Sequence, residues 1–178
     1  MKTSVFLLII LCSFITYGQS PERGNVIPEF GKTFEVQNPE FATDTTSLLK
    51  VVFDVNRSFN AEEPNKLIET AARFLNMHEK AGVVPSNMRV ALVIHGKAVK
   101  DVLAHTFYRE EFPSSSKNPN ISLIEALVEN GVELVLCGQS AAHYKVSREK
   151  AHPQVKFALS AMTALVQLQN ENYRLIAF

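Results

Sequence analysis

The chain has 178 residues, of which 46% are hydrophobic and 20% charged, and it carries 18 basic and 18 acidic side chains. This composition is typical of a globular protein with enough apolar side chains for one core, so a single domain is expected. Because the charges balance and no basic run is interleaved with aromatic residues, nucleic acid is not expected to be a partner.

Residues 1–18 have the pattern of a cleaved secretory signal peptide. Lys2 gives a short positive region, Val5 to Leu11 form an apolar run, and Thr16 to Gly18 offer small residues for cleavage. A membrane anchor is the alternative, but this run is far shorter than the roughly 18 to 20 residues that a spanning helix needs. We therefore expect an exported protein, periplasmic or extracellular, with no stable membrane insertion after the signal is removed.

The chain contains two cysteines, Cys12 and Cys137. Cys12 lies near the end of the apolar run and leaves a lipoprotein signal open, although the bulky Leu11 precedes it where such signals have a small residue. Signal removal leaves Cys137 as the only cysteine of the mature protein, so no disulfide can form within it. In an oxidising compartment such a cysteine is a buried apolar residue, an intermolecular crosslink or a free reactive thiol.

Residues 19–47 are expected to form an irregular N-terminal arm. They carry several prolines and glycines among polar side chains and show no sustained periodicity. Apolar residues such as Ile27, Phe30 and Phe34 are too frequent for a free linker, so part of the arm is expected to pack on the domain that follows, residues 48–178.

Buried strands and amphipathic helices alternate through that domain. Nearly continuous β-favouring apolar runs predict strands at 48–55, 89–95, 132–137 and 173–178. Helices are expected at 64–81, around 98–104, at 120–130, in a short stretch after Cys137, and at 155–169, where Pro153 marks the start; 110–119 is expected to be a loop. This alternation predicts an α/β fold with a parallel sheet covered on both faces.

The expected site lies at the carboxyl ends of the strands, where ligands bind in open parallel sheets. Three strand ends would supply, in chain order, Asn56, His95 with Gly96, and Cys137 with Gly138 and Gln139. Their side chains are expected to surround one cleft.

Cys137 is the main candidate for a reactive group. It ends a strand, and backbone N–H groups of Gly138 and Gln139 at the following helix start would stabilise its thiolate and lower the pKa of the thiol. On this hypothesis the side chain is partly exposed. The alternative is a buried cysteine that acts as a small core residue.

His95 has several alternative roles: a general base, a partner for a bound anion, a metal ligand, or a cap of its strand. Asp54 is the one carboxylate near these strand ends, and we expect it to order the loop that follows. The five histidines show no metal-ligand spacing, and no GxGxxG, phosphate-loop or GxSxG motif occurs. No metal site, no cofactor and no hydrolase centre are therefore predicted.

The chain from about residue 48 to 178 resembles the DsrE/DsrF-like family. The resemblance is carried by LLKVVFDV, VALVIHGKAV, GVELVLCGQSA and the closing HPQVKFALSAMTALVQLQNENYRLIAF. It implies a three-layer α/β/α sandwich around a mainly parallel sheet of four to five strands, and assembly as a homo-oligomer, a trimer or hexamer. It also implies a persulfide on Cys137, although Tyr144-Lys145 replaces the basic-glycine pair often found after the cysteine in sulfur-relay members.

Two functions follow as expectations. The first is a sulfur-handling, persulfide-carrying or thiol-redox protein that acts through Cys137, sulfurtransferase-like if it is an enzyme, with a sulfur donor or acceptor protein as partner. The second is a non-catalytic oligomeric module that binds a small ligand. In both, Asn56, His95, Gly96, Gly138 and Gln139 surround the ligand, and in the second Cys137 only lines the pocket.

Overall fold

The computed structural model describes residues 19–178, and the predicted signal peptide with Cys12 lies outside the described residues. The strands are β1 (Leu49–Val55), β2 (Met88–Ile94), β3 (Glu133–Cys137), β4 (Lys156–Ala158) and β5 (Arg174–Ile176). The α-helices are α1 (Lys66–Lys80), α2 (His105–Glu111), α3 (Ile121–Glu129), α4 (Gly138–His143) and α5 (Ala161–Asn170), with 3-10 segments η1 (Pro85–Asn87) and η2 (Gly96–Val102). Within residues 19–178, no helix has the length and apolar character needed to cross a bilayer.

The five strands form one parallel sheet in the order β4-β3-β2-β1-β5. β1 and β2 pair from Leu49 with Met88 to Val55 with Ile94, and the β2–β3 ladder ends where Ile94 pairs with Leu136. The carboxyl ends of the three central strands therefore meet at one edge of the sheet. This confirms the predicted parallel sheet of four to five strands.

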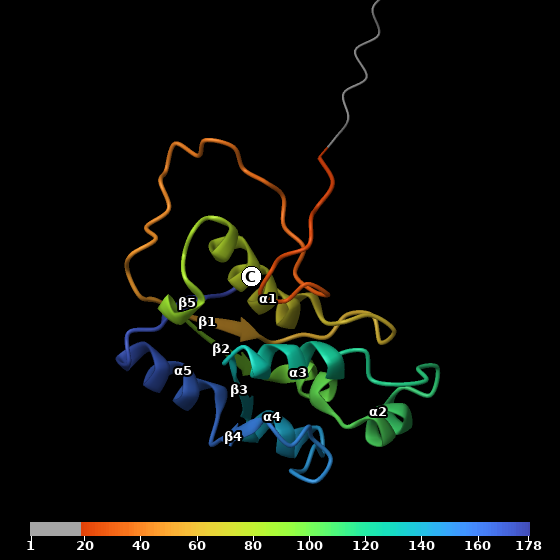
Figure 1. Cartoon of the computed structure of the whole chain (residues 1–178). Coiled ribbons are helices and arrows are strands. Elements are labelled where there is room, and N and C mark those ends of the chain that lie inside the picture. Colours follow the sequence, from red (N-terminus) through yellow and green to blue (C-terminus); the bar gives the residue numbers. More distant parts are fainter. Residues whose placement is uncertain (1–18) are drawn as a thin grey trace, which may run out of the picture.

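Helices cover both faces of the sheet, because side chains alternate between its faces along each strand. One set of strand residues packs under α1 and α3, and includes Phe53, Leu92, Ile94, Leu134 and Leu136. The opposite set packs against Ala161, Ala164 and Leu168 of α5, and comprises Val52, Ala91, Val93, Val135 and Cys137. Figure 1 shows α1 and α5 on opposite sides of the strands, which confirms the three-layer α/β/α sandwich.

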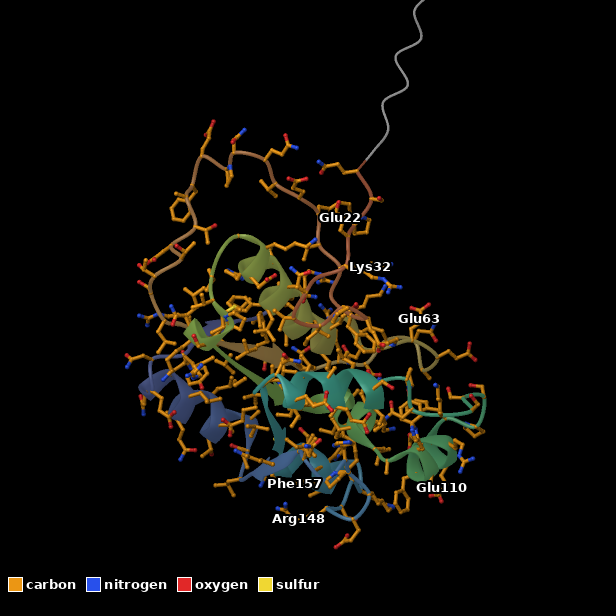
Figure 2. The ribbon with its side chains drawn as sticks, in the orientation of Figure 1. Glu22, Lys32, Glu63, Glu110, Arg148 and Phe157 are labelled. Atoms are coloured by element: carbon orange, nitrogen blue, oxygen red, sulfur yellow. The ribbon has the colours of Figure 1, made fainter. Side chains whose placement is uncertain are left out.

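The helix predicted for 155–169 is wrong in its first part. Lys156–Ala158 instead forms the edge strand β4, which pairs with β3 up to Cys137 opposite Ala158. Arg148 stacks on the ring of Phe157 in β4, with its guanidinium carbon 4.8 Å from the ring centroid; both residues are labelled in Figure 2. The helix starts only after Ser160, whose hydroxyl accepts a hydrogen bond from the N–H of Thr163 at 3.0 Å.

The region between β2 and α3 also differs from the prediction. The segment expected to be helical around 98–104 is the 3-10 segment η2, Gly96–Val102, and a separate helix, α2, covers residues 105–111. The predicted loop therefore begins after α2. Tyr108 holds α2 in place, because its ring is fully buried and its hydroxyl donates to the carbonyl of Ala61 at 2.9 Å.

The N-terminal arm, residues 19–47, forms no helix or strand beyond an isolated bridge between Glu22 and Thr33. Part of it docks on α1 through Asn76, a fully buried residue. Its Oδ1 accepts the N–H of Ile27 at 2.8 Å, and its Nδ2 donates to the carbonyls of Ile27 and Phe30 at 3.0 and 2.9 Å. Figure 1 shows the later part of the arm as an arch over the end of α1.

A buried polar cluster joins three loops beside the sheet. The carboxylate of Asp101, 1% exposed, accepts hydrogen bonds from Ser58 Oγ at 2.7 Å and Asn65 Nδ2 at 2.6 Å. Asn118 Nδ2 donates to the Asp101 carbonyl at 2.8 Å, and the N–H of Asn65 donates to Asn120 Oδ1 at 2.7 Å. These contacts fix the loop after β1 against η2 and against the segment that leads into α3.

Candidate functional site

Three neighbouring strands bring Asp54, His95 and Cys137 to the same face of the sheet, the face covered by α5. Asp54 is two residues after Val52 on β1, and Cys137 is two residues after Val135 on β3, both members of the set beneath α5. His95 extends β2 by one residue, since its backbone is extended and its N–H donates to the carbonyl of Val55 at 2.8 Å.

A cavity of about 320 Å³ lies between these strand ends and the start of α5. Its polar lining comes from Asp54, His95, Cys137, Gln139 and Ser160, and its apolar lining from Ala161, Met162 and Leu165. The structure thus brings together His95, Cys137 and Gln139, three of the residues singled out from the sequence. Within residues 19–178, no group of three or more His, Cys, Asp or Glu side chains is placed to hold a metal ion.

Cys137 lies at the floor of this cavity and is only 5% exposed, so the expectation of a partly exposed side chain is wrong. The reason is α5, whose first residue, Ala161, packs against the same face of the sheet. The sulfur is nevertheless in polar surroundings. Cys137 is the N-cap of α4, and its Sγ accepts a hydrogen bond from the N–H of Ser140 at 3.4 Å.

The pKa of the Cys137 thiol is lowered from its usual value. Burial alone would raise it, but hydrogen bonds from the hydroxyl and N–H of Ser140 and from the N–H groups of Ala161 and Gln139 outweigh that effect. These donors belong to the first turns of two helices, α4 and α5, where backbone N–H groups favour a negative charge. The thiolate, which is the nucleophilic form of cysteine, is therefore favoured.

Asp54 and His95 form a hydrogen-bonded pair in the same cavity. His95 Nε2 donates to Asp54 Oδ1 at 2.8 Å, and their side chains are 29% and 15% exposed. With Nε2 engaged, Nδ1 is the ring nitrogen left for a ligand or a proton. Asp54 also touches the following loop, because Asn56 Nδ2 lies 3.4 Å from its second oxygen. The closer hydrogen-bond partner of Asp54 is therefore the imidazole of His95, and not the loop after β1.

Asn56, Gly96 and Gly138 do not line the cavity. Asn56 is exposed. The N–H of Gly96 donates to Ser140 Oγ at 3.0 Å. Gly96 has a φ of +55°, and a Cβ at this position would lie only 2.4 Å from the carbonyl oxygen of Asn56. A Cβ on Gly138 would lie 2.6 Å from the carbonyl oxygen of Ala158. Both glycines thus permit close packing of the backbone around the site.

Sequence reasoning missed two contributors to the site, Ser140 as a hydroxyl donor and the start of α5. Ser140 is held by Gly96 and in turn supports the Cys137 sulfur. Ser160 caps α5 and so fixes Ala161 beside that sulfur. A serine immediately before an apolar-periodic segment is a helix-start signal that would have identified Ser160, but Pro153 suggested an earlier start.

Comparisons with known proteins agree on the fold. The structure of MTH1491, a protein of unknown function from Methanobacterium thermoautotrophicum, is similar with a TM-score of 0.53 and 16% identity, covering 73% of this chain and 99% of that chain. The ychN protein from E. coli is similar with a TM-score of 0.53 and 19% identity, with the same coverage. A search of curated proteins found no match. The model of the DsrE/DsrF-like family matches residues 50–178, and the chain therefore belongs to the DsrE/DsrF-like family.

Proposed function

We propose that the protein handles sulfur through Cys137, which accepts a sulfane sulfur atom as a persulfide and passes it on. The observation that carries the proposal is the position of the Cys137 sulfur at two helix starts, with N–H donors around it, at the floor of a cavity. Membership of the DsrE/DsrF-like family supports it, since sulfur-relay members carry a persulfide on the cysteine that Cys137 resembles.

The chemistry matches what this cavity offers. The Cys137 thiolate attacks the outer sulfur of a donor R–S–SH, and the donor S–S bond breaks with its electron pair on R–S. The product is a Cys137 persulfide and the free thiol R–SH after protonation. The donors at Ser140, Ala161 and Gln139 can hold negative charge on the sulfur, and the low exposure of Cys137, 5%, limits access of water and of other thiols to it.

Sulfur loading tests this function directly. The purified protein is incubated with inorganic polysulfide, and peptide mass spectrometry is expected to locate one additional sulfur atom on Cys137, which a small acceptor thiol then removes. Protein isolated from its own compartment is expected to carry part of this modification already. An unmodified Cys137 after treatment that persulfidates free cysteine under the same conditions would contradict the proposal.

A non-catalytic binding module is the second candidate, favoured by the low exposure of Cys137 and by the apolar wall of Ala161, Met162 and Leu165. In that case the cavity holds a small ligand and the thiol only lines it. Native mass spectrometry separates the two candidates, because a bound molecule above an unmodified thiol supports the module and a covalent sulfur supports the carrier.

Export and self-association complete the proposal. Export is proposed from residues 1–18. Assembly as a trimer or hexamer is proposed from the family resemblance and from three apolar side chains in α5 or just before it, Leu159, Met162 and Val166, which are 73%, 76% and 57% exposed. Light scattering at micromolar concentration is expected to report an oligomer for the parent and a smaller species for Met162→Glu. A monomeric parent would contradict self-association.

A further inference from the structure

The cavity contains the hydrogen-bonded pair Asp54 and His95 as well as the thiol of Cys137. His95 and Cys137 line the same cavity, and Asp54 holds the imidazole through Nε2 at 2.8 Å. Asp54 and His95 meet because of the strand order of the sheet, in which β2 lies between β1 and β3. A histidine held in this way by a carboxylate has a fixed ring orientation and one free nitrogen, Nδ1.

Sulfur transfer from an ordinary alkyl persulfide has a specific chemical requirement. The leaving group is an alkyl thiolate, whose conjugate thiol has a pKa of about 8.5, and such thiolates leave more slowly than acidic ones. A proton delivered to the departing sulfur removes this obstacle. The helix N–H donors around Cys137 stabilise the nucleophile, but they supply no proton to the leaving group.

We propose that His95, positioned by Asp54, carries this proton; the inference rests on the proposed function. The Cys137 thiol gives its proton to His95 Nδ1, and the resulting thiolate attacks the outer sulfur of R–S–SH. The donor S–S bond breaks, its electron pair goes to R–S, and that sulfur takes the proton from His95. The products are Cys137–S–SH and R–SH, with His95 returned to its starting form and no oxidant or reductant consumed.

The same cavity indicates the class of donor. Among the described residues, the lining includes the acidic side chain of Asp54 and no Lys or Arg. A dianionic donor such as thiosulfate would meet this carboxylate without a fixed cationic partner, and its leaving group, sulfite, does not need the proton that His95 supplies. The apolar wall at Ala161, Met162 and Leu165 suits an alkyl chain. The donor is therefore the persulfide of a small alkyl thiol of low charge.

The test compares two reagents that the Cys137 thiolate attacks and that differ in their leaving groups. One is the persulfide of N-acetylcysteine methyl ester, with a basic leaving thiolate; the other is dithiodipyridine, an uncharged disulfide with an acidic one. The quantity compared is the rate of the persulfide reaction divided by the rate of the dithiodipyridine reaction. Because both reactions use the Cys137 thiolate, a change in the thiolate fraction cancels in this ratio. His95→Asn is expected to lower this ratio by about a hundredfold. Asp54→Asn, which keeps an acceptor oxygen beside the ring, is expected to lower it less.

Three results would overturn the inference, and they differ from a failure of the proposed function. An unchanged ratio in both variants would exclude proton transfer by His95, and loading from thiosulfate as fast as from the alkyl persulfide would exclude the donor class. His143→Asn, a matched change at an exposed residue of α4, is expected to leave the ratio unchanged; an equal fall there would also exclude a specific role for His95. If no donor places sulfur on Cys137, the proposed function itself is wrong. If His95→Asn fails to fold, the ratio measured for Asp54→Asn alone tests the inference.

Discussion

Cys137→Ser is expected to abolish sulfur loading completely while the melting temperature stays close to that of the parent. Serine lacks the nucleophilic sulfur, so no persulfide can form. Its hydroxyl nevertheless remains beside the N–H of Ser140, which lies 3.4 Å from Sγ in the parent, and it faces a cavity rather than a closed core. With its hydrogen bond retained, the buried hydroxyl should cost less than about 1 kcal/mol.

The measurement pairs peptide mass spectrometry after polysulfide treatment with a thermal melt of the same samples. Ser140→Ala serves as a graded control, because it removes one supporting hydroxyl and leaves the thiol, so its labelling is expected to slow without disappearing. If Cys137 is instead only a core residue, the opposite results are expected. Cys137→Ser would then lower the free energy of unfolding by about 1 to 3 kcal/mol, and the parent thiol would resist labelling.

The strand ends were predictable because fully buried parallel strands are continuous apolar runs with clear limits. The run ending at Cys137 and the run ending at His95 are of this kind, and both residues lie where the run predicts them. The family resemblance pointed to the same cysteine. What these patterns do not contain is strand order, and the Asp54–His95 pair depends on β1 lying next to β2.

The errors have a common cause in short elements. β4 has three residues, too few for a periodic signal, and its conformation depends on pairing with β3 rather than on its own sequence. The helix prediction therefore ran through β4 and missed the cap at Ser160. Since the first turn of α5 is what buries Cys137 and adds the N–H of Ala161, the exposure of the thiol was mispredicted for the same reason.

Asp101 makes the stability of the protein depend on pH in a way that Asp101→Asn should remove. Burial raises the pKa of this carboxyl to about 6 from 3.8, although hydrogen bonds from Asn65 and Ser58 act in the opposite direction. Asp101 belongs to the buried polar cluster that joins the segment after β1 to η2. Asparagine can keep both contacts, by accepting from Asn65 Nδ2 and donating to Ser58 Oγ.

The sign follows from proton binding. The folded state holds the Asp101 proton up to about pH 6, whereas the unfolded chain releases it near pH 3.8, so this group stabilises the fold at low pH and loses that contribution as the pH rises through about 6. The shift corresponds to about 3 kcal/mol. Urea unfolding of parent and Asp101→Asn is expected to show the parent losing about this much stability relative to the variant between about pH 3.8 and pH 6.

Asp44→Asn is the control, because hydrogen bonds from Ser47 and Thr46 lower the pKa of that exposed carboxyl and move its titration in the folded state below this interval. A parent-to-variant difference for Asp101→Asn that stays constant with pH would mean that Asp101 titrates alike in both states.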